Sequence, residues 1–165
     1  MMPIYLISVL NYSEYFAGAA MGLMGAGYLI GAVLNQNLQS NKLAPIYIYT
    51  DFGIFVSFLL MSLTVNLFAI YFCMLLFGIC MSVRNITGWT YMQQVMPRNL
   101  AGRITSIQRT FGWGGCAVGP FLGALILEYH SIQAEIIFCC SLSIITLLIS
   151  ISLARKNSLE FVIET

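Results

Sequence analysis

Apolar residues run through this chain in five long blocks, and short polar stretches separate the blocks. A block of about 20 apolar residues has the length that an α-helix needs to cross a lipid bilayer. The pattern predicts membrane helices at about 16–34, 44–65, 67–94, 104–127 and 136–154, in a single membrane domain over residues 1–165. Residues 1–10 are apolar but too few to span, and we expect them to be the end of another helix.

The composition indicates the same class of protein. Hydrophobic residues make up 59% of the chain and charged residues only 8%, whereas soluble domains carry roughly 25% charged residues. So little charge cannot solvate a globular surface, and we expect an all-α, polytopic membrane protein. The net charge of +1 gives no reason to expect nucleic-acid binding. The five cysteines follow no CxxC or Cys/His spacing, so we expect no disulfide framework, metal site or cofactor.

The basic residues predict the topology. With five spans, one side of the membrane receives Lys42, Arg98, Arg103, Arg109, Arg155 and Lys156, and the other side receives Glu14, Glu128 and Glu135 without any Lys or Arg. Cytoplasmic loops carry the excess of Lys and Arg in membrane proteins. We therefore expect a multi-pass protein of the cell membrane (inner or plasma membrane) with a cytoplasmic C-terminus.

Glycines at helical spacing mark two predicted helices. The first helix contains the pairs Gly18/Gly22 and Gly27/Gly31, and the fourth contains Gly115, Gly119, Pro120 and Gly123. Such small-residue faces let helix backbones approach closely in lipid. Pro120 also removes a backbone donor and is expected to bend its helix. These faces fit either plain helix contacts or a hinge surface in a protein that rocks.

Asp51 and Arg84 lie well inside predicted spans. An arginine at a helix centre costs about 2.5–3.5 kcal/mol on insertion scales, so Arg84 is a functional candidate. Counted at about 1.5 Å per residue from Asn66, Arg84 lies in the inner half of the membrane and Asp51 roughly 4.5 Å shallower. We hypothesise an Asp51–Arg84 pair that shields both charges or relays a proton. The alternative is that Arg84 extends to the cytoplasmic headgroups.

Further polar positions extend this part of the third helix. Arg84, Gly88 and Tyr91 share a face at i, i+4 and i+7, and Asn85 lies beside them. Such a face is suited to lining an aqueous substrate pathway, and each residue taken singly also fits a polar contact between helices. The sequence has no nucleophile–base arrangement, so we do not expect an enzyme.

Several motifs resemble those of the major facilitator superfamily. The run QQVMPRNLAGRITS, which includes Pro97, Gly102 and Arg103, resembles the cytoplasmic turn between that family's tenth and eleventh helices. The opening PIYLISVLNYSEYFAGAAMGLMGAGYLIGAVL is similar to the end of its seventh helix, an outer loop and a glycine-rich eighth helix.

Two further motifs are similar with departures. Gly115, Gly119, Pro120 and Gly123 resemble the family's antiporter motif, with Ala124 in place of its last glycine. Arg84 and Gly88 resemble its R-x-x-q-G motif, with Thr87 where Gln is usual. The stretch GAVLNQNLQSNK at 31–42 has lost the acid and most basic residues of the family's cytoplasmic motif.

The resemblance implies a fold and a function. The fold would be five helices of a six-helix half bundle, closest to the C-terminal half in the branch of drug and siderophore exporters. The antiporter-like motif at 115–124 and the motif at Arg84 and Gly88 also fit the N-terminal half. The function would be proton-coupled efflux of a small molecule between this half and a missing N-terminal half. The partners would then be the lipid bilayer, the substrate and that half. The alternative is a non-transporting membrane scaffold or regulatory subunit derived from a transporter.

Overall fold

The computed structural model describes Ile7 and residues 12–37, 43–64, 66–97, 99–129 and 132–163. At 37, 43–44, 94–95, 127–129, 132–136 and 153–163 it describes the backbone only. The expectations for residues 1–10 other than Ile7, for Lys42 and for Arg98 therefore lie outside the described residues. For Glu128, Glu135, Arg155 and Lys156 the structure gives a place in a helix and nothing more.

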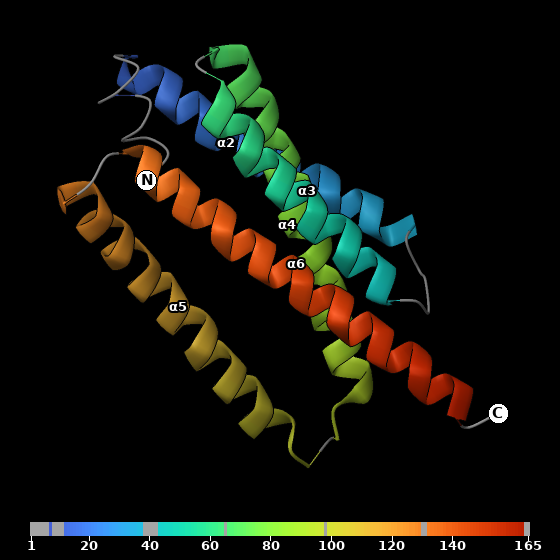
Figure 1. Cartoon of the computed structure of the whole chain (residues 1–165). Coiled ribbons are helices and arrows are strands. Elements are labelled where there is room, and N and C mark those ends of the chain that lie inside the picture. The colour runs from blue at the N-terminus through green and yellow to red at the C-terminus, as the bar shows by residue number, and fades with distance from the viewer. Residues whose placement is uncertain are drawn as a thin grey trace.

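The described ranges contain long helices and no strand, which confirms the all-α fold. The helices are α2 (Glu14–Asn37), α3 (Leu43–Leu63), α4 (Leu67–Val95), α5 (Ala101–Tyr129) and α6 (Ile132–Ile163). Consecutive helices run in opposite directions (Figure 1). Each helix overlaps one of the five expected ranges. The largest difference is at α6, which continues to Ile163 instead of ending near 154, because no Gly or Pro stops the helix there.

The ends of α4 follow from local chemistry. The side chain of Asn66 accepts a hydrogen bond from the Phe68 amide at 3.0 Å, which satisfies one of the free donors at the helix start. At the other end, Met96 is extended, with φ −73° and ψ 124°, as steric contact with the following Pro97 requires. α4 has 29 residues and is about 44 Å long, so it exceeds the hydrocarbon thickness of a bilayer.

The closest packing in the molecule joins α2 to α4, which run parallel. A Cβ at Gly27 would collide with the backbone oxygen of Leu75, and one at Gly78 would collide with that of Met24. A Cβ at Gly31 would lie 2.6 Å from the Ile79 oxygen. The buried core continues along this interface as Ala17, Ala20, Ile70, Cys73 and Met74, and Met61 of α3 belongs to the same cluster. Glycine is therefore required here because the two backbones touch.

Hydrogen bonds tie α2 to α4 at several levels. Tyr71 donates to the Phe16 carbonyl at 3.2 Å, and Ser82 donates to the Tyr28 carbonyl at 2.8 Å. Further along, the Thr87 hydroxyl donates to Asn35 Oδ1 at 2.9 Å, with Thr87 buried. These contacts advance together along both helices, as the parallel arrangement requires.

The Thr87–Asn35 bond predicts a measurable stability effect. Thr87→Val keeps the side-chain shape but removes the donor, and we expect it to lower the free energy of unfolding by about 0.5–1.5 kcal/mol. Unfolding of the purified chain in detergent, followed by circular dichroism, measures this. Thr110→Val is the matched control, because the exposed Thr110 hydroxyl bonds only to the Ser106 carbonyl of its own helix. Equal effects of the two substitutions would contradict the role of the cross-helix bond.

The helix α5 stands apart from this packing. α3 lies against both α4 and α6, whereas α5 has its main contact with α6 (Figure 1). Every residue from 110 to 122 is exposed, including Phe111, Trp113 and Phe121. The helix runs without interruption through Pro120. A long face of α5 is therefore free of neighbours among the described residues.

Within the described part of the chain, three helices are long and apolar enough to cross a membrane: Glu14–Gln36, Pro45–Leu63 and Leu67–Gln93. A fourth apolar segment, Ile137–Ser152, is shorter. α5 is not among them within the residues that the structure describes. Large apolar side chains are exposed on every helix, which a protein in water avoids and a lipid-embedded one does not.

Candidate functional site: a buried ion pair between three helices

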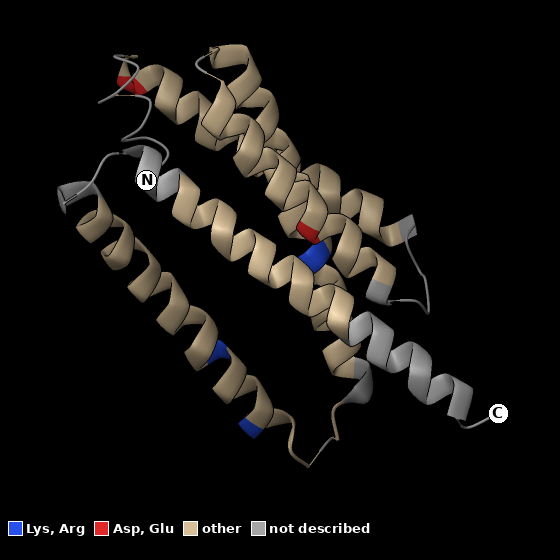
Figure 2. Ribbon diagram, in the orientation of Figure 1, with Lys and Arg blue, Asp and Glu red and all other residues tan. Residues whose placement is uncertain are grey.

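The charged residues inside the helices are in contact. Arg84 Nη1 of α4 lies 3.1 Å from Asp51 Oδ1 of α3. The Asp51 side chain is 0% exposed, whereas that of Arg84 is 31% exposed. An acidic and a basic residue lie side by side in the middle of the bundle in Figure 2. The buried carboxylate thus has its counter-ion, and that counter-ion has partial access to the surroundings.

A third helix supplies the remaining partner of the carboxylate. The Ser150 hydroxyl of α6 donates a short hydrogen bond of 2.5 Å to Asp51 Oδ2. Asp51 Oδ1 makes the ion contact with Arg84 but has no hydrogen-bond donor with good geometry among the described residues. The carboxylate is therefore held at one oxygen by a neutral donor and at the other by charge.

The register between antiparallel α3 and α4 explains why these residues meet. Phe58 stacks edge-on against Phe77 with ring centroids 5.4 Å apart. One and a half turns further along, a Cβ at Gly53 would lie 2.5 Å from Cys80 Sγ. The next contact in this direction is Asp51 with Arg84. The apolar pairs therefore set the alignment that brings the charges together.

One turn beyond the ion pair, Tyr47 lies over Gly88. A Cβ at Gly88 would be 2.6 Å from the Tyr47 hydroxyl oxygen, so this glycine leaves room for the phenol. Tyr47 precedes Asp51 by four residues and Gly88 follows Arg84 by four, so each pair shares a helix face. Gly88 thus belongs to the same cluster as the ion pair.

The other two expected pathway residues differ in their surroundings. Asn85 Nδ2 donates to the Tyr28 hydroxyl at 3.2 Å, which directs it toward α2 and away from Asp51. Tyr91 is exposed on α4. The structure therefore brings Arg84, Asp51 and Gly88 together and directs Asn85 away from them, while Tyr91 lies at the exposed edge of the cluster, within electrostatic range of Tyr47.

The expected helix-packing glycines also separate into two groups. Gly27 and Gly31 lie against the α4 backbone. A Cβ at Gly18, Gly22, Gly115 or Gly119 would meet nothing within 4 Å among the described residues. Gly123 is buried, and Pro120 is exposed. Gly115, Gly119 and the first α2 pair thus have no helix against them in the described chain.

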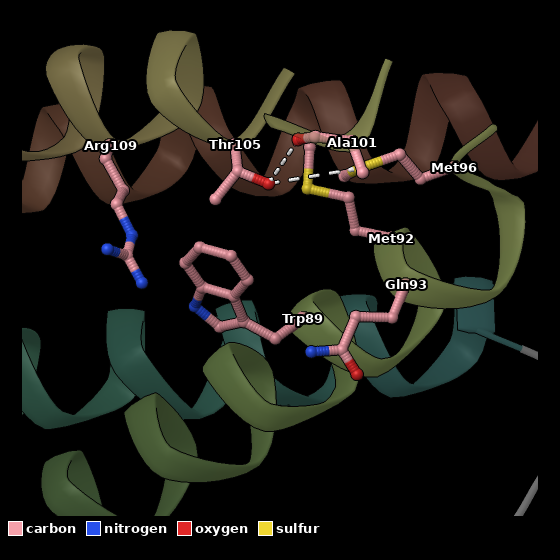
Figure 3. Close-up of a pocket in the computed structure, with 7 residues that line it drawn as sticks. All are labelled: Trp89, Met92, Gln93, Met96, Ala101, Thr105 and Arg109. Atoms are coloured by element: carbon pink, nitrogen blue, oxygen red, sulfur yellow. Dashed lines mark hydrogen bonds between the residues drawn. The ribbon is translucent and has the colours of Figure 1, made fainter. Parts of the chain in front are cut away.

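A cavity opens where α4 gives way to α5. Its volume is about 370 Å³, and its lining residues are Trp89, Met92, Gln93, Met96, Ala101, Thr105 and Arg109 (Figure 3). Of the three expected turn residues, Pro97 and Gly102 adjoin this lining in sequence, and Arg103 lies on the same first turns of α5. All three are exposed and none of them lines the cavity.

Sequence reasoning missed several of these residues. Ser150 sits in an apolar block with other serines, and nothing in its spacing marks it as the partner of Asp51. Tyr47 could have been found, since it lies one turn from the only acid inside a span. Thr105 and Arg109 were visible only as parts of a basic turn, and Trp89 as an aromatic residue near a helix end.

Comparison with known proteins identifies the family. A search of curated proteins and a search of solved structures each found no match. A family model described as the Major Facilitator Superfamily matches residues 1–160, nearly the whole chain. Members of this family are transporters, and the long apolar helices agree with a multi-pass membrane protein. On this match the chain belongs to the Major Facilitator Superfamily of transporters.

Proposed function

We propose that the chain is the C-terminal part of a proton-coupled exporter of small molecules, similar to drug and siderophore exporters, and that Asp51 and Arg84 form its charge relay. The observation that carries the proposal is the ion pair itself. A charged side chain at membrane depth is costly, and residues of this kind mark proton relays and substrate pathways. Here the acid is fully buried while its cation is partly exposed.

The contacts suggest how such a relay works. In the resting arrangement the Asp51 carboxylate is balanced by Arg84 and accepts a hydrogen bond from Ser150. When the carboxylate takes up a proton, it loses its charge and its attraction for Arg84. The guanidinium is then free to bind another anion or to reorient. Release of the proton on the other side of the membrane restores the pair, so the cycle returns to its start.

The open face of α5 supports the proposal of a missing N-terminal half. Gly115 and Gly119 have free space above them, and Phe111, Trp113 and Phe121 are exposed beside them. Small residues on a membrane helix let a second backbone approach closely. In a transporter built from two halves, rocking of one half against the other takes place at such a surface. We propose that this face of α5 is the contact with the other half.

The positions of the arginines on α5 suggest how the chain is oriented in the membrane. Arg103 and Arg109 lie on the first turns of α5, and Glu14 begins α2 at the opposite end of the bundle (Figure 2). By the positive-inside rule the α4–α5 turn and the C-terminus would lie in the cytoplasm, with the protein in the cell membrane. Cysteine labelling from either side of sealed vesicles would contradict this if Gly102→Cys reacted only from outside.

The relay predicts a loss of coupled transport. The chain, joined to an N-terminal half, is reconstituted in vesicles that hold a pH-sensitive dye, and proton movement is recorded as candidate neutral, cationic and anionic compounds are added. Asp51→Asn removes the titrating group, and we expect coupled proton movement to fall at least about tenfold.

The control for this experiment is Glu14→Gln. It makes the same chemical change at an exposed acid that pairs with no described residue, and we expect it to leave transport unchanged. If Asp51→Asn transports at the unmodified rate under the same gradient, the relay proposal is wrong. If no compound moves protons through the unmodified protein, export itself is contradicted.

A further inference from the structure

We propose that the cavity between α4 and α5 binds an amphipathic organic anion, a compact aromatic or apolar body that bears one carboxylate or sulfonate group. This assignment rests on the proposed function, since it names the substrate class that the exporter would take up at this end. The support for it comes from the residues that line the cavity, and neither Asp51 nor Arg84 is among them.

Charge is the first argument. Arg109 is the one charged residue among the seven that line the cavity. Among the side chains that the structure describes, the acids are Glu14 and Asp51, and Asp51 already pairs with Arg84. Arg109 has no ion-pair or hydrogen-bond partner in the described chain. A planar guanidinium left free in this way matches a carboxylate or sulfonate through two parallel hydrogen bonds.

The shape and chemistry of the other walls are the second argument. Figure 3 shows Arg109 extending from α5 into the space that the Trp89 indole of α4 also borders. The Met92 and Met96 thioethers close one side of the cavity, and such flexible, polarizable groups adapt to apolar ligands of different outline. An indole face suits a flat apolar body. The cavity therefore places an anion-binding group beside an apolar surface.

The volume of the cavity and its polar groups further limit which ligands fit. A volume of about 370 Å³ lies near the lower end of the usual range for small-molecule sites, so it suits a compound of one or two rings. The Thr105 hydroxyl is already engaged with the Ala101 carbonyl at 2.7 Å. The Gln93 amide has no partner in the described part of the chain and is available to orient the ligand.

The position of the cavity agrees with binding of the substrate before it reaches the Asp51–Arg84 pair. Trp89 follows Arg84 by five residues, so the cavity begins about 7.5 Å further along α4. It lies at the end of the bundle that carries the α4–α5 turn, which the proposed orientation puts in the cytoplasm. In that orientation a substrate anion would meet Arg109 before it reached the level of the second cation, Arg84, which protonation of Asp51 releases.

Fluorescence of the purified chain tests the assignment. The chain has two tryptophans, so Trp113→Phe leaves Trp89 in the cavity wall as the sole reporter. In phosphatidylcholine nanodiscs, para-nitrobenzenesulfonate is expected to quench this fluorescence saturably. The neutral para-nitrobenzenesulfonamide is expected to bind at least about tenfold more weakly, as is the sulfonate to the Arg109→Gln variant.

The matched control is Arg103→Gln, which removes an equal charge from the same helix outside the cavity, and it is expected to retain the affinity. Unsaturable quenching, equal binding of the sulfonamide, or unchanged affinity in Arg109→Gln would overturn the assignment. Nanodiscs that contain phosphatidylglycerol are expected to give the same affinity. Displacement of the probe by this lipid in an Arg109-dependent manner would assign the cavity to lipid headgroups instead.

Binding to the isolated chain needs neither a partner half nor a proton gradient. Saturable, Arg109-dependent binding without coupled transport in vesicles would therefore refute the proposed function and leave the anion site standing. Coupled transport of neutral or cationic compounds with no anion binding would refute the site alone.

Discussion

Arg84→Gln is expected to lower the free energy of unfolding by about 3–5 kcal/mol, because it leaves the Asp51 charge buried without a counter-ion. The Asp51 side chain is fully buried, and after the substitution its remaining bond is the one from Ser150. A single neutral hydrogen bond does not replace an ion contact at 3.1 Å. Denaturation of the purified chain in mixed micelles with increasing dodecyl sulfate, followed by circular dichroism, measures the loss.

Substitution of the acidic partner should lower the free energy of unfolding by less than Arg84→Gln does. Asp51→Asn leaves Arg84 unpaired, but its side chain is 31% exposed and long enough to move toward water or headgroups. An asparagine amide also keeps a bond to Ser150. The double variant should lose less stability than the sum of the two single variants, since the residues are in direct contact. Additive losses would show that the two charges do not stabilise each other.

Gly78→Ala is expected to cost about 1–3 kcal/mol of stability, the range for overpacking a well-packed interior. The added Cβ would collide with the Met24 carbonyl oxygen and come within 3.2 Å of Gly27 Cα. These atoms belong to the α2 backbone, so no side chain can turn aside to make room. The two helices would have to separate, which also weakens the nearby bond from Ser82 to the Tyr28 carbonyl. The same unfolding measurement applies.

Gly22→Ala is the matched control for this substitution. A Cβ at Gly22 meets nothing within 4 Å of the described chain. Alanine has the higher helix propensity, so the variant should be unchanged or more stable by up to about 1 kcal/mol. A destabilisation of Gly22→Ala equal to that of Gly78→Ala would mean that packing against α4 is not the reason for the glycine.

Counting residues from a turn predicts the depth of a charged residue in the membrane, but not which neighbour it contacts. From the distances to the turn at Asn66, Asp51 was expected to lie a few Å shallower than Arg84 but close enough to pair with it, and the two side chains are in contact. Depth alone does not determine which way each side chain faces. The facing is determined by the alignment of α3 on α4 through Phe58, Phe77, Gly53 and Cys80. Asn85 follows Arg84 directly, yet it bonds to Tyr28 on the other side of α4.

The sequence itself determined the order of the helices and their apolar character. It also determined that Asp51 and Arg84 lie within apolar spans. The reason is that span length and hydropathy are local properties of the chain. Tertiary structure alone decided which glycines are needed and which residue completes the ion pair. Gly18/Gly22 and Gly27/Gly31 have the same spacing, but only the second pair meets another backbone. Ser150 reaches Asp51 because α6 packs on α3, and that contact joins positions 99 residues apart in the chain.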